Sequence, residues 1–102
     1  MPQFLVIAYD GTDPEAKARR QAARPAHLEG VRPMVDKGEM IAGGAILDEA
    51  GEMVGPATIV EFPGRAELDA WLAADPYVTG GVWRNVEVRP FRVAVTAAGQ
   101  GR

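Results

Sequence analysis

The feature that most constrains this chain is an apolar run near its start, residues 3–9, which reads Gln-Phe-Leu-Val-Ile-Ala-Tyr. Alternate residues of a strand point to opposite faces of a sheet, and both alternating sets in this run are apolar. The run therefore predicts a strand that is covered on both faces. Whatever fold forms must supply a cover for each face.

The rest of the chain predicts further elements around this strand. In order they are a helical region at residues 14–37, a strand at 40–47, a strand at 57–62, a helix at 65–74 and a strand from 82 to about 95. This β-α-β-β-α-β order is typical of the ferredoxin-like fold, an α+β arrangement with a four-stranded antiparallel sheet and both helices on one face. Because the helices cover only one face, the second apolar face of the first strand predicts a homodimer that buries it.

The prolines predict interruptions in the helical region. A residue that precedes proline is pushed away from helical backbone angles, so we expect a break at Arg24 and a second helix that opens at Pro25. Pro33 predicts a kink, and Gly38 predicts the end of the helix. Three apolar residues of the second stretch recur at helical spacing and support its assignment as helix: Leu28, Val31 and Val35.

Composition limits the functional classes. The 102 residues fit one domain, expected at residues 1–95 with a disordered tail at 96–102. Fourteen acidic residues against eleven basic ones give a net charge of -3, which disfavours nucleic acid as a partner. The chain has no cysteine and one histidine, so we expect no disulfide and no metal site. No apolar run is long enough for a membrane span or a signal peptide, and a cytoplasmic protein is expected.

The candidate chemistry depends on the single histidine, His27. Imidazole is the only side chain whose unperturbed charge change falls near neutral pH, which suits it to general acid or base catalysis. Asp75 lies 48 residues away, in an Asp-Pro-Tyr triplet, and could orient the ring if the fold brings the two together. In the first turn of a helix begun by Pro25, His27 would be kept neutral by the helix dipole. The alternative is a structural histidine and a turn-forming aspartate.

Several motifs, taken in order, resemble the YCII-related (YciI-like) family over residues 3–95. They are Arg24-x-x-His27-Leu28, then Gly38 followed by an apolar strand that contains glycine, an Ala-Glu-Leu-x-x-Trp helix, Asp75-Pro76-Tyr77 followed by a glycine pair, and Val86-x-Val88-x-Pro90-Phe91. The resemblance implies a dimeric α+β barrel of ferredoxin-like subunits. It also implies a pocket that holds a His-Asp pair, here His27 and Asp75. Most members of the family have no assigned function, and one branch includes a dehydrochlorinase that acts on a chlorinated hydroxyhydroquinone.

Four other residues are candidates for substrate binding. Arg24 could pair with an anionic group, although an exposed arginine is usually solvated. Tyr9 could form a wall of the pocket, and Thr58 could supply a hydroxyl group beside the pair. Tyr77 could present its hydroxyl at the mouth of the pocket, but an aromatic residue beside Asp-Pro is more often a packing anchor.

The remaining conspicuous residues are interpreted as structural. We expect Trp71 to face the core and Trp83 to line the sheet or the dimer contact. Two glycine pairs, at 43–44 and 80–81, lack the strand-to-helix context of a phosphate-binding loop, so no cofactor is implied. The first pair lies inside a predicted strand and leaves room for a close approach by another backbone or a ligand.

Together these features predict a small cofactor-independent enzyme that uses a His-Asp pair for elimination, isomerisation or dehydrochlorination of a small activated molecule. The competing hypothesis is a non-catalytic dimeric module that binds a small ligand. A cofactor-free oxygenase or isomerase of the same fold is a third, because the fold alone does not determine the reaction.

Overall fold

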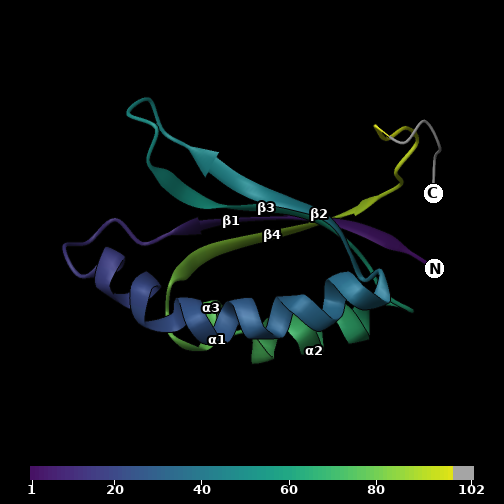
Figure 1. Cartoon of the computed structure of the whole chain (residues 1–102), viewed down its shortest axis with the longest axis horizontal. Coiled ribbons are helices and arrows are strands. Elements are labelled where there is room, and N and C mark those ends of the chain that lie inside the picture. Colours follow the sequence, from purple (N-terminus) through teal and green to yellow (C-terminus); the bar gives the residue numbers. More distant parts are fainter. Residues whose placement is uncertain (98–102) are drawn as a thin grey trace.

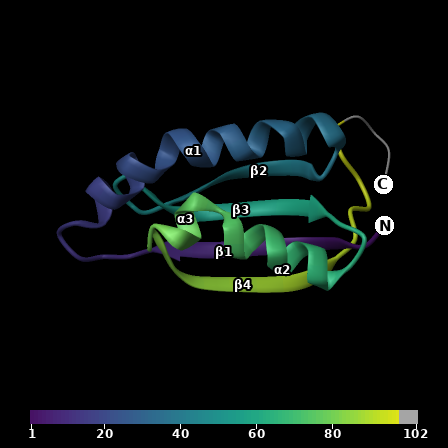
Figure 2. The same cartoon turned by 90° about the horizontal axis from the view of Figure 1, so that it is seen from below.

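Four antiparallel strands form one sheet in the order β2-β3-β1-β4, in a computed structural model that describes residues 1–97 (Figure 1). The elements are β1 (Gln3–Asp10), α1 (Ala16–Lys37), β2 (Met40–Leu47), β3 (Met53–Glu61), α2 (Arg65–Ala74), α3 (Pro76–Thr79) and β4 (Trp83–Phe91). The predicted ferredoxin-like fold is confirmed, with α3 as an additional short helix. Figure 2 shows α1 lying along the β2 side of the sheet and α2 along the β1-β4 side.

The helices cover one face of the sheet, and the core lies beneath them (Figure 1). On β1 the residues that point towards the helices, Phe4, Val6 and Ala8, are all buried. They join two buried clusters, one under α2 and one beside α3. The first consists of Phe4, Val6, Met34, Val60, Phe62 and Leu68, and the second of Ala8, Tyr77, Val82 and Trp83.

The predicted break at Arg24 is wrong, because α1 is one helix of 22 residues that contains both Pro25 and Pro33. Both prolines lie on the exposed side of the helix. There, water can bind the carbonyl groups that a proline leaves without a partner, and a helix that packs on a sheet is already convex towards solvent. The residues that face the sheet keep their helical spacing on either side of both prolines. Gly38 ends the helix in a left-handed conformation, as predicted.

One side of α1 faces the sheet. The residues on it are at least half-buried and recur every three or four positions: Ala16, Arg20, Ala23, His27, Val31 and Met34. Arg19 is also half-buried and pairs with Asp13. Leu28 and Val35 are exposed. The inner side of α1 therefore carries two polar side chains, Arg20 and His27.

The last strand ends at Phe91, earlier than the predicted end near Val95. The chain leaves the ladder because the backbone N–H of Val93 donates to Oε1 of Gln3 at 2.7 Å, and Val93 is buried at that point. Residues 98–102 of the predicted disordered tail lie outside the described residues. Among residues 1–97, no helix combines the length and the apolar composition needed to cross a lipid bilayer.

A substitution at Gly55 on β3 tests how closely β3 approaches β1. A Cβ atom at this position would overlap the backbone carbonyl of Ala8 on β1. We expect Gly55→Ala to lower the free energy of unfolding in urea by about 2 kcal/mol or more, since neighbouring backbone must move. Gly30→Ala is the control: this residue lies inside α1 with open space around it, and alanine should stabilise by about 1 kcal/mol. A Gly55→Ala protein as stable as the wild type would contradict the strand packing.

Candidate functional site

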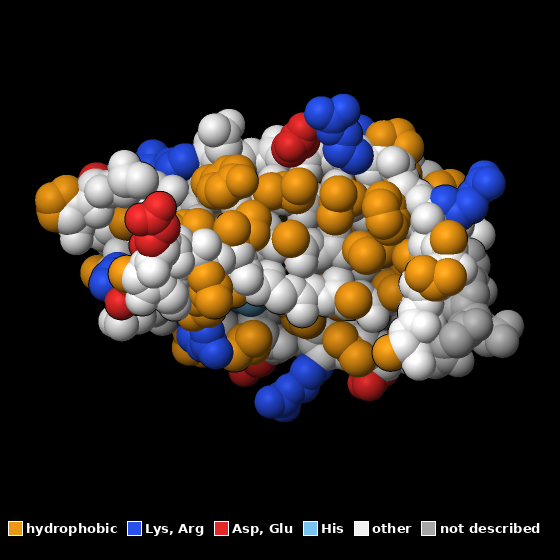
Figure 3. Space-filling model, turned by 90° about the horizontal axis from the view of Figure 1, so that it is seen from above, with side chains coloured by type: hydrophobic (Ala, Val, Ile, Leu, Met, Phe, Trp, Pro, Cys, Tyr) orange, Lys and Arg blue, Asp and Glu red, His pale blue; other side chains and the backbone are white. Residues whose placement is uncertain are grey.

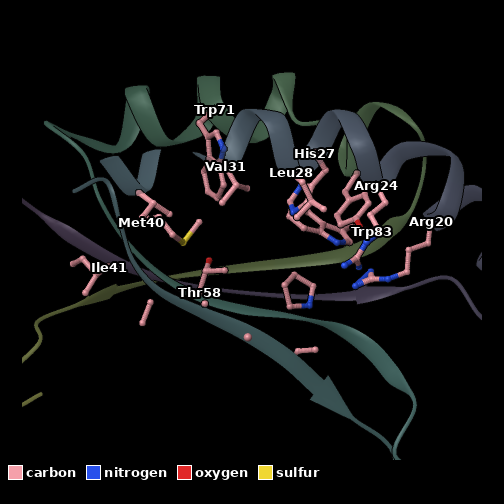
Figure 4. Close-up of a pocket in the computed structure, with 17 residues that line it drawn as sticks. Arg20, Arg24, His27, Leu28, Val31, Met40, Ile41, Thr58, Trp71 and Trp83 are labelled. Carbon is pink, nitrogen blue, oxygen red and sulfur yellow. The ribbon is translucent and has the colours of Figure 1, made fainter. Parts of the chain in front are cut away.

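A cavity of about 550 Å³ lies between α1 and the β2-β3 half of the sheet (Figure 4). This volume is within the range of small-ligand sites. Much of the wall is apolar and comes from Leu28, Val31, Val35, Met40, Ile41 and Pro56. Polar side chains gather at one end, where Figure 4 shows Arg20, Arg24, His27 and Trp83.

Asp75 is held by its own loop. It ends α2 and serves as the N-cap of α3, where its Oδ1 accepts a hydrogen bond from the backbone N–H of Tyr77 at 2.8 Å. Pro76 occupies the first turn of α3, where its missing N–H removes no helical hydrogen bond. Asp-Pro-Tyr is therefore a compact capping motif that holds a carboxylate in one orientation. Only 5% of Asp75 is exposed.

His27 meets this carboxylate from the middle of α1. Its Nδ1 lies 2.9 Å from Oδ1 and 3.1 Å from Oδ2 of Asp75. The structure thus brings together the two residues that the sequence placed 48 positions apart. His27 is not in a first helical turn, so the helix dipole invoked for it from Pro25 does not act on it. The carboxylate is the group that orients the ring.

The geometry determines the chemistry that the ring can perform. A carboxylate only accepts hydrogen bonds, so Nδ1 is the ring nitrogen that carries the hydrogen. In the neutral ring Nε2 then has a free lone pair, and within residues 1–97 it has no hydrogen-bond partner. His27 lines the cavity, and its side chain is 16% exposed. The ring can accept a proton from a bound molecule and return it.

Aromatic rings hold the imidazole on two sides. The Tyr77 ring stacks on His27 with the centroids 3.9 Å apart and the planes within 15°. Trp83 meets His27 edge to face at 6.0 Å and also contacts Tyr77. The Arg20 guanidinium lies 5.0 Å from the centre of the Tyr77 ring, within cation-π range.

Trp83 reaches this site because β4 has an irregular register. Asn85 pairs with Tyr9 and Trp83 pairs with Asp10, so Arg84 is an extra residue between them. A bulge of this kind moves the residues beyond it to the other face of the sheet. Without the bulge, alternation would place Trp83 with Asn85 and Glu87 on the outer face of the sheet. Trp83 does line the sheet, one of the two positions expected for it, but on the face that packs against the helices. It is 7% exposed and faces the helices.

Ion pairs hold the start of α1 beside the site. Arg20 contacts Asp10 at 3.2 Å, and burial raises the pKa of the Asp10 carboxyl while the Arg20 charge opposes that rise. Arg19 donates from Nη1 and Nη2 of its guanidinium to the two carboxylate oxygens of Asp13, and this hydrogen bonding holds the pKa of Asp13 well below its usual range. Arg20 has no predicted role in the sequence analysis, although its spacing of seven from His27 places both residues on one side of a helix.

The other candidate residues are distributed as follows. Arg24, Thr58 and Tyr77 line the cavity with His27. Tyr77 is buried and serves as a packing partner of the imidazole. Tyr9 is not among the lining residues; it is 47% exposed and lies on the face of the sheet opposite the helices. Strand alternation separates it from the site, because its neighbour Ala8 faces inward.

Glycine keeps part of the cavity floor open. Gly43 lies beside Thr58, and a Cβ atom at Gly43 would approach the Thr58 methyl group at 3.1 Å.

The described residues offer no cluster of metal ligands. In residues 1–97 no three histidine, aspartate or glutamate side chains are close enough to hold a metal ion.

Sequence comparison finds similar proteins over most of the chain. The family model of the YCII-related domain matches residues 3–92. Protein YciI of Escherichia coli O6:H1 is 33% identical over 95 residues, covering 87% of this chain and 95% of that protein. An uncharacterised protein of Haemophilus influenzae is also 33% identical, over 96 residues, with the same coverage.

A solved structure extends the comparison. The 5-chloro-2-hydroxyhydroquinone dehydrochlorinase TftG of Burkholderia phenoliruptrix AC1100, in complex with 2,5-dihydroxybenzoquinone, aligns with a TM-score of 0.76 and 22% identity. The alignment covers 89% of this chain and 94% of that one. At this identity the likeness shows a shared fold.

Asp75→Ala tests the double role of the carboxylate. It leaves the Tyr77 N–H and the His27 Nδ1–H without an acceptor, and we expect the free energy of unfolding in urea to fall by about 2 to 4 kcal/mol. Asp75→Asn keeps an oxygen that can cap α3, and its free energy of unfolding should fall by about half as much. The control Asp69→Ala removes an exposed carboxylate from α2 and should cost less than about 0.5 kcal/mol. Equal effects of Asp75→Ala and Asp69→Ala would refute the capping role.

Proposed function

The chain belongs to the YCII-related domain family, and on that premise we propose that it is a small cofactor-independent enzyme that performs acid/base chemistry on a small activated molecule. His27 is the general base and acid, and Asp75 is the residue that positions it. The observation that carries this proposal is the 2.9 Å contact between Nδ1 and the buried carboxylate, which leaves Nε2 for a molecule in the cavity.

The proposed reaction is a proton transfer that leads to elimination or isomerisation. Nε2 takes a proton from an acidic C–H or O–H of the substrate, and the electron pair of that bond forms a new π bond. In elimination the leaving group, such as chloride, departs with its own electron pair. The imidazolium, held by Asp75, then gives its proton to product or water. A positioned base contributes about 10² to 10⁴ in rate, which suits substrates that are already acidic.

The shared fold with TftG supports the choice of a probe. That protein is named for dehydrochlorination of 5-chloro-2-hydroxyhydroquinone, a compact, acidic, chlorinated ring. The 550 Å³ cavity has room for a single ring of this size. We therefore propose testing this compound together with a panel of small carbon acids.

The test follows chloride release and the uptake of deuterium from D₂O by panel members. We expect the wild type to turn over at least one compound, His27→Gln to lower kcat by at least about 100-fold, and Asp75→Asn to lower it by about 10-fold or more. Asp69→Asn, on the exposed side of α2, is the matched control and should retain the wild-type rate.

Two results would contradict the proposal. If the wild type binds members of the panel but turns over none, the chain is a ligand-binding module. If His27→Gln turns over substrate at the wild-type rate, the imidazole is not the base.

We also propose that two chains pair through the sheet face opposite the helices. Figure 3 shows this face, where apolar side chains gather over its centre. Strand register places on it Leu5, Ile7, Ala42, Ile46, Ala57 and Ile59. Charged residues of β4, the ion pair of Glu87 and Arg89, lie at its edge. Apolar surface gathered in one patch of this kind favours burial against a second copy.

A charge at the centre of this face tests the dimer. In sedimentation equilibrium we expect the wild type to have twice the mass of one chain, and Ile7→Glu to have the mass of one chain, because it buries an unpaired carboxylate in the interface. Gly30→Glu adds the same charge on the exposed side of α1 and should leave the dimer intact. A wild-type protein that is monomeric at all concentrations would refute the pairing.

A further inference from the structure

Buried polar atoms without partners are concentrated at the cavity. Among residues 1–97, four buried side-chain nitrogen or oxygen atoms have no hydrogen-bond partner. Three of them belong to residues that line the cavity: Nε of Arg20, Oγ1 of Thr58 and Nε1 of Trp83. Unsatisfied buried groups are rare in folded proteins, and their collection around one cavity indicates a ligand that supplies the missing partners.

The cavity presents hydrogen-bond donors. An indole N–H and a guanidinium can only donate, and a threonine hydroxyl can donate as well as accept. The carboxylates near this end already have partners: the oxygens of Asp75 contact His27 and the Tyr77 backbone, and Asp10 pairs with Arg20. No aspartate or glutamate is among the described residues that line the cavity. A ligand that satisfies this site must therefore offer acceptors.

The charge of the cavity is positive at the same end. Arg20 and Arg24 both line it, and Arg20 is paired with Asp10. Arg24 has no ion-pair partner within residues 1–97. Figure 4 shows both arginines at the end of the cavity where His27 and Trp83 lie. An oxygen that carries negative charge at this end would meet the indole N–H, a free guanidinium and the imidazole together.

The shape and polarity of the rest of the cavity define the body of the ligand. Beyond the polar end, the wall consists of aliphatic side chains such as Leu28, Val31 and Met40. Figure 4 shows the Thr58 oxygen directed from the sheet into the space below α1. A small apolar body with a second oxygen on its far side fits these surroundings.

We infer that the cavity binds a small oxyanion with an apolar body, and that the Trp83 indole N–H donates to the charged oxygen while Arg24 neutralises its charge. This inference rests on the proposed function, because it specifies the substrate class of the same site. Trp83 is the specificity-determining residue: its N–H distinguishes an ionised hydroxyl group from its neutral ether. Thr58 receives the second oxygen.

The test compares two ligands that differ in charge. 2,5-Dihydroxybenzoquinone is an acidic vinylogous acid and is ionised at neutral pH, whereas 2,5-dimethoxybenzoquinone has the same ring and cannot ionise. Calorimetric titration at pH 7 should show that the wild type binds the anion at least about 10-fold more tightly than the ether. Trp83→Phe keeps a flat apolar ring and removes the donor. This variant should bind the anion about 10-fold less tightly than the wild type does, and its affinity for the ether should change by less than two-fold.

Two control variants isolate the indole and the charge. Trp71→Phe makes the same exchange at another wall of the cavity, where the indole N–H is not among the buried unpartnered donors, and should change the affinities for the two ligands by the same factor. Arg24→Gln should lower the affinity for the anion by about 10-fold and reduce the salt dependence of that affinity. Arg65→Gln removes an exposed arginine from α2 and should change neither the affinity for the anion nor its salt dependence.

Binding without turnover separates this inference from the proposed function. His27→Gln, which lacks the base, should still prefer the anion. Equal affinity of the wild type for both quinones, no binding of either one, or an equal loss for both ligands in Trp83→Phe would overturn the inference. None of these results depends on whether the enzyme releases chloride.

Discussion

The hydrogen bond between Nδ1 of His27 and the Asp75 carboxylate joins two parts of the chain that lie 48 positions apart in the sequence. One partner stands in the middle of α1 and the other in the turn between α2 and α3. Because the capping motif fixes the carboxylate before any ligand arrives, the imidazole needs no rearrangement to expose Nε2. Tyr77, stacked on the ring, adds a second constraint from the same motif. The proposed reactivity therefore depends on a capping turn, in which the Tyr77 N–H holds the Asp75 carboxylate.

Much of this arrangement could be predicted from the sequence. The order of elements and the double-sided apolar strand predict the sheet, and the single histidine and the Asp-Pro-Tyr triplet indicate the two residues of the candidate pair. What could not be predicted was the continuity of α1. Local rules predict a break before Pro25 and a kink at Pro33, but both prolines lie on the exposed side, where water can bind the carbonyl groups that they leave without a partner. The inner side of the helix, which carries Arg20 and His27, depends on that continuity.

Trp83 shows a second limit of sequence patterns. Its place in the alternation of β4 assigns it to the outer face, and one extra residue at Arg84 reverses the assignment. Bulges depend on the pairing of two strands, so nothing in β4 alone reveals one. The same bulge supplies the indole that faces the imidazole. Tyr9 shows the opposite case: it lies beside the bulge in the ladder but remains on the outer face.

The most direct test of the central claim is the ¹⁵N NMR spectrum of the ring of His27, which is unambiguous because the chain has a single histidine. At a pH where the ring is neutral, hydrogen should reside on Nδ1, and Nε2 should show the chemical shift of a nitrogen with a free lone pair. A neutral ring that carries its hydrogen on Nε2, or one that exchanges freely between the two tautomers, would contradict the account. In either case Asp75 would not be the group that prepares the imidazole to accept a proton.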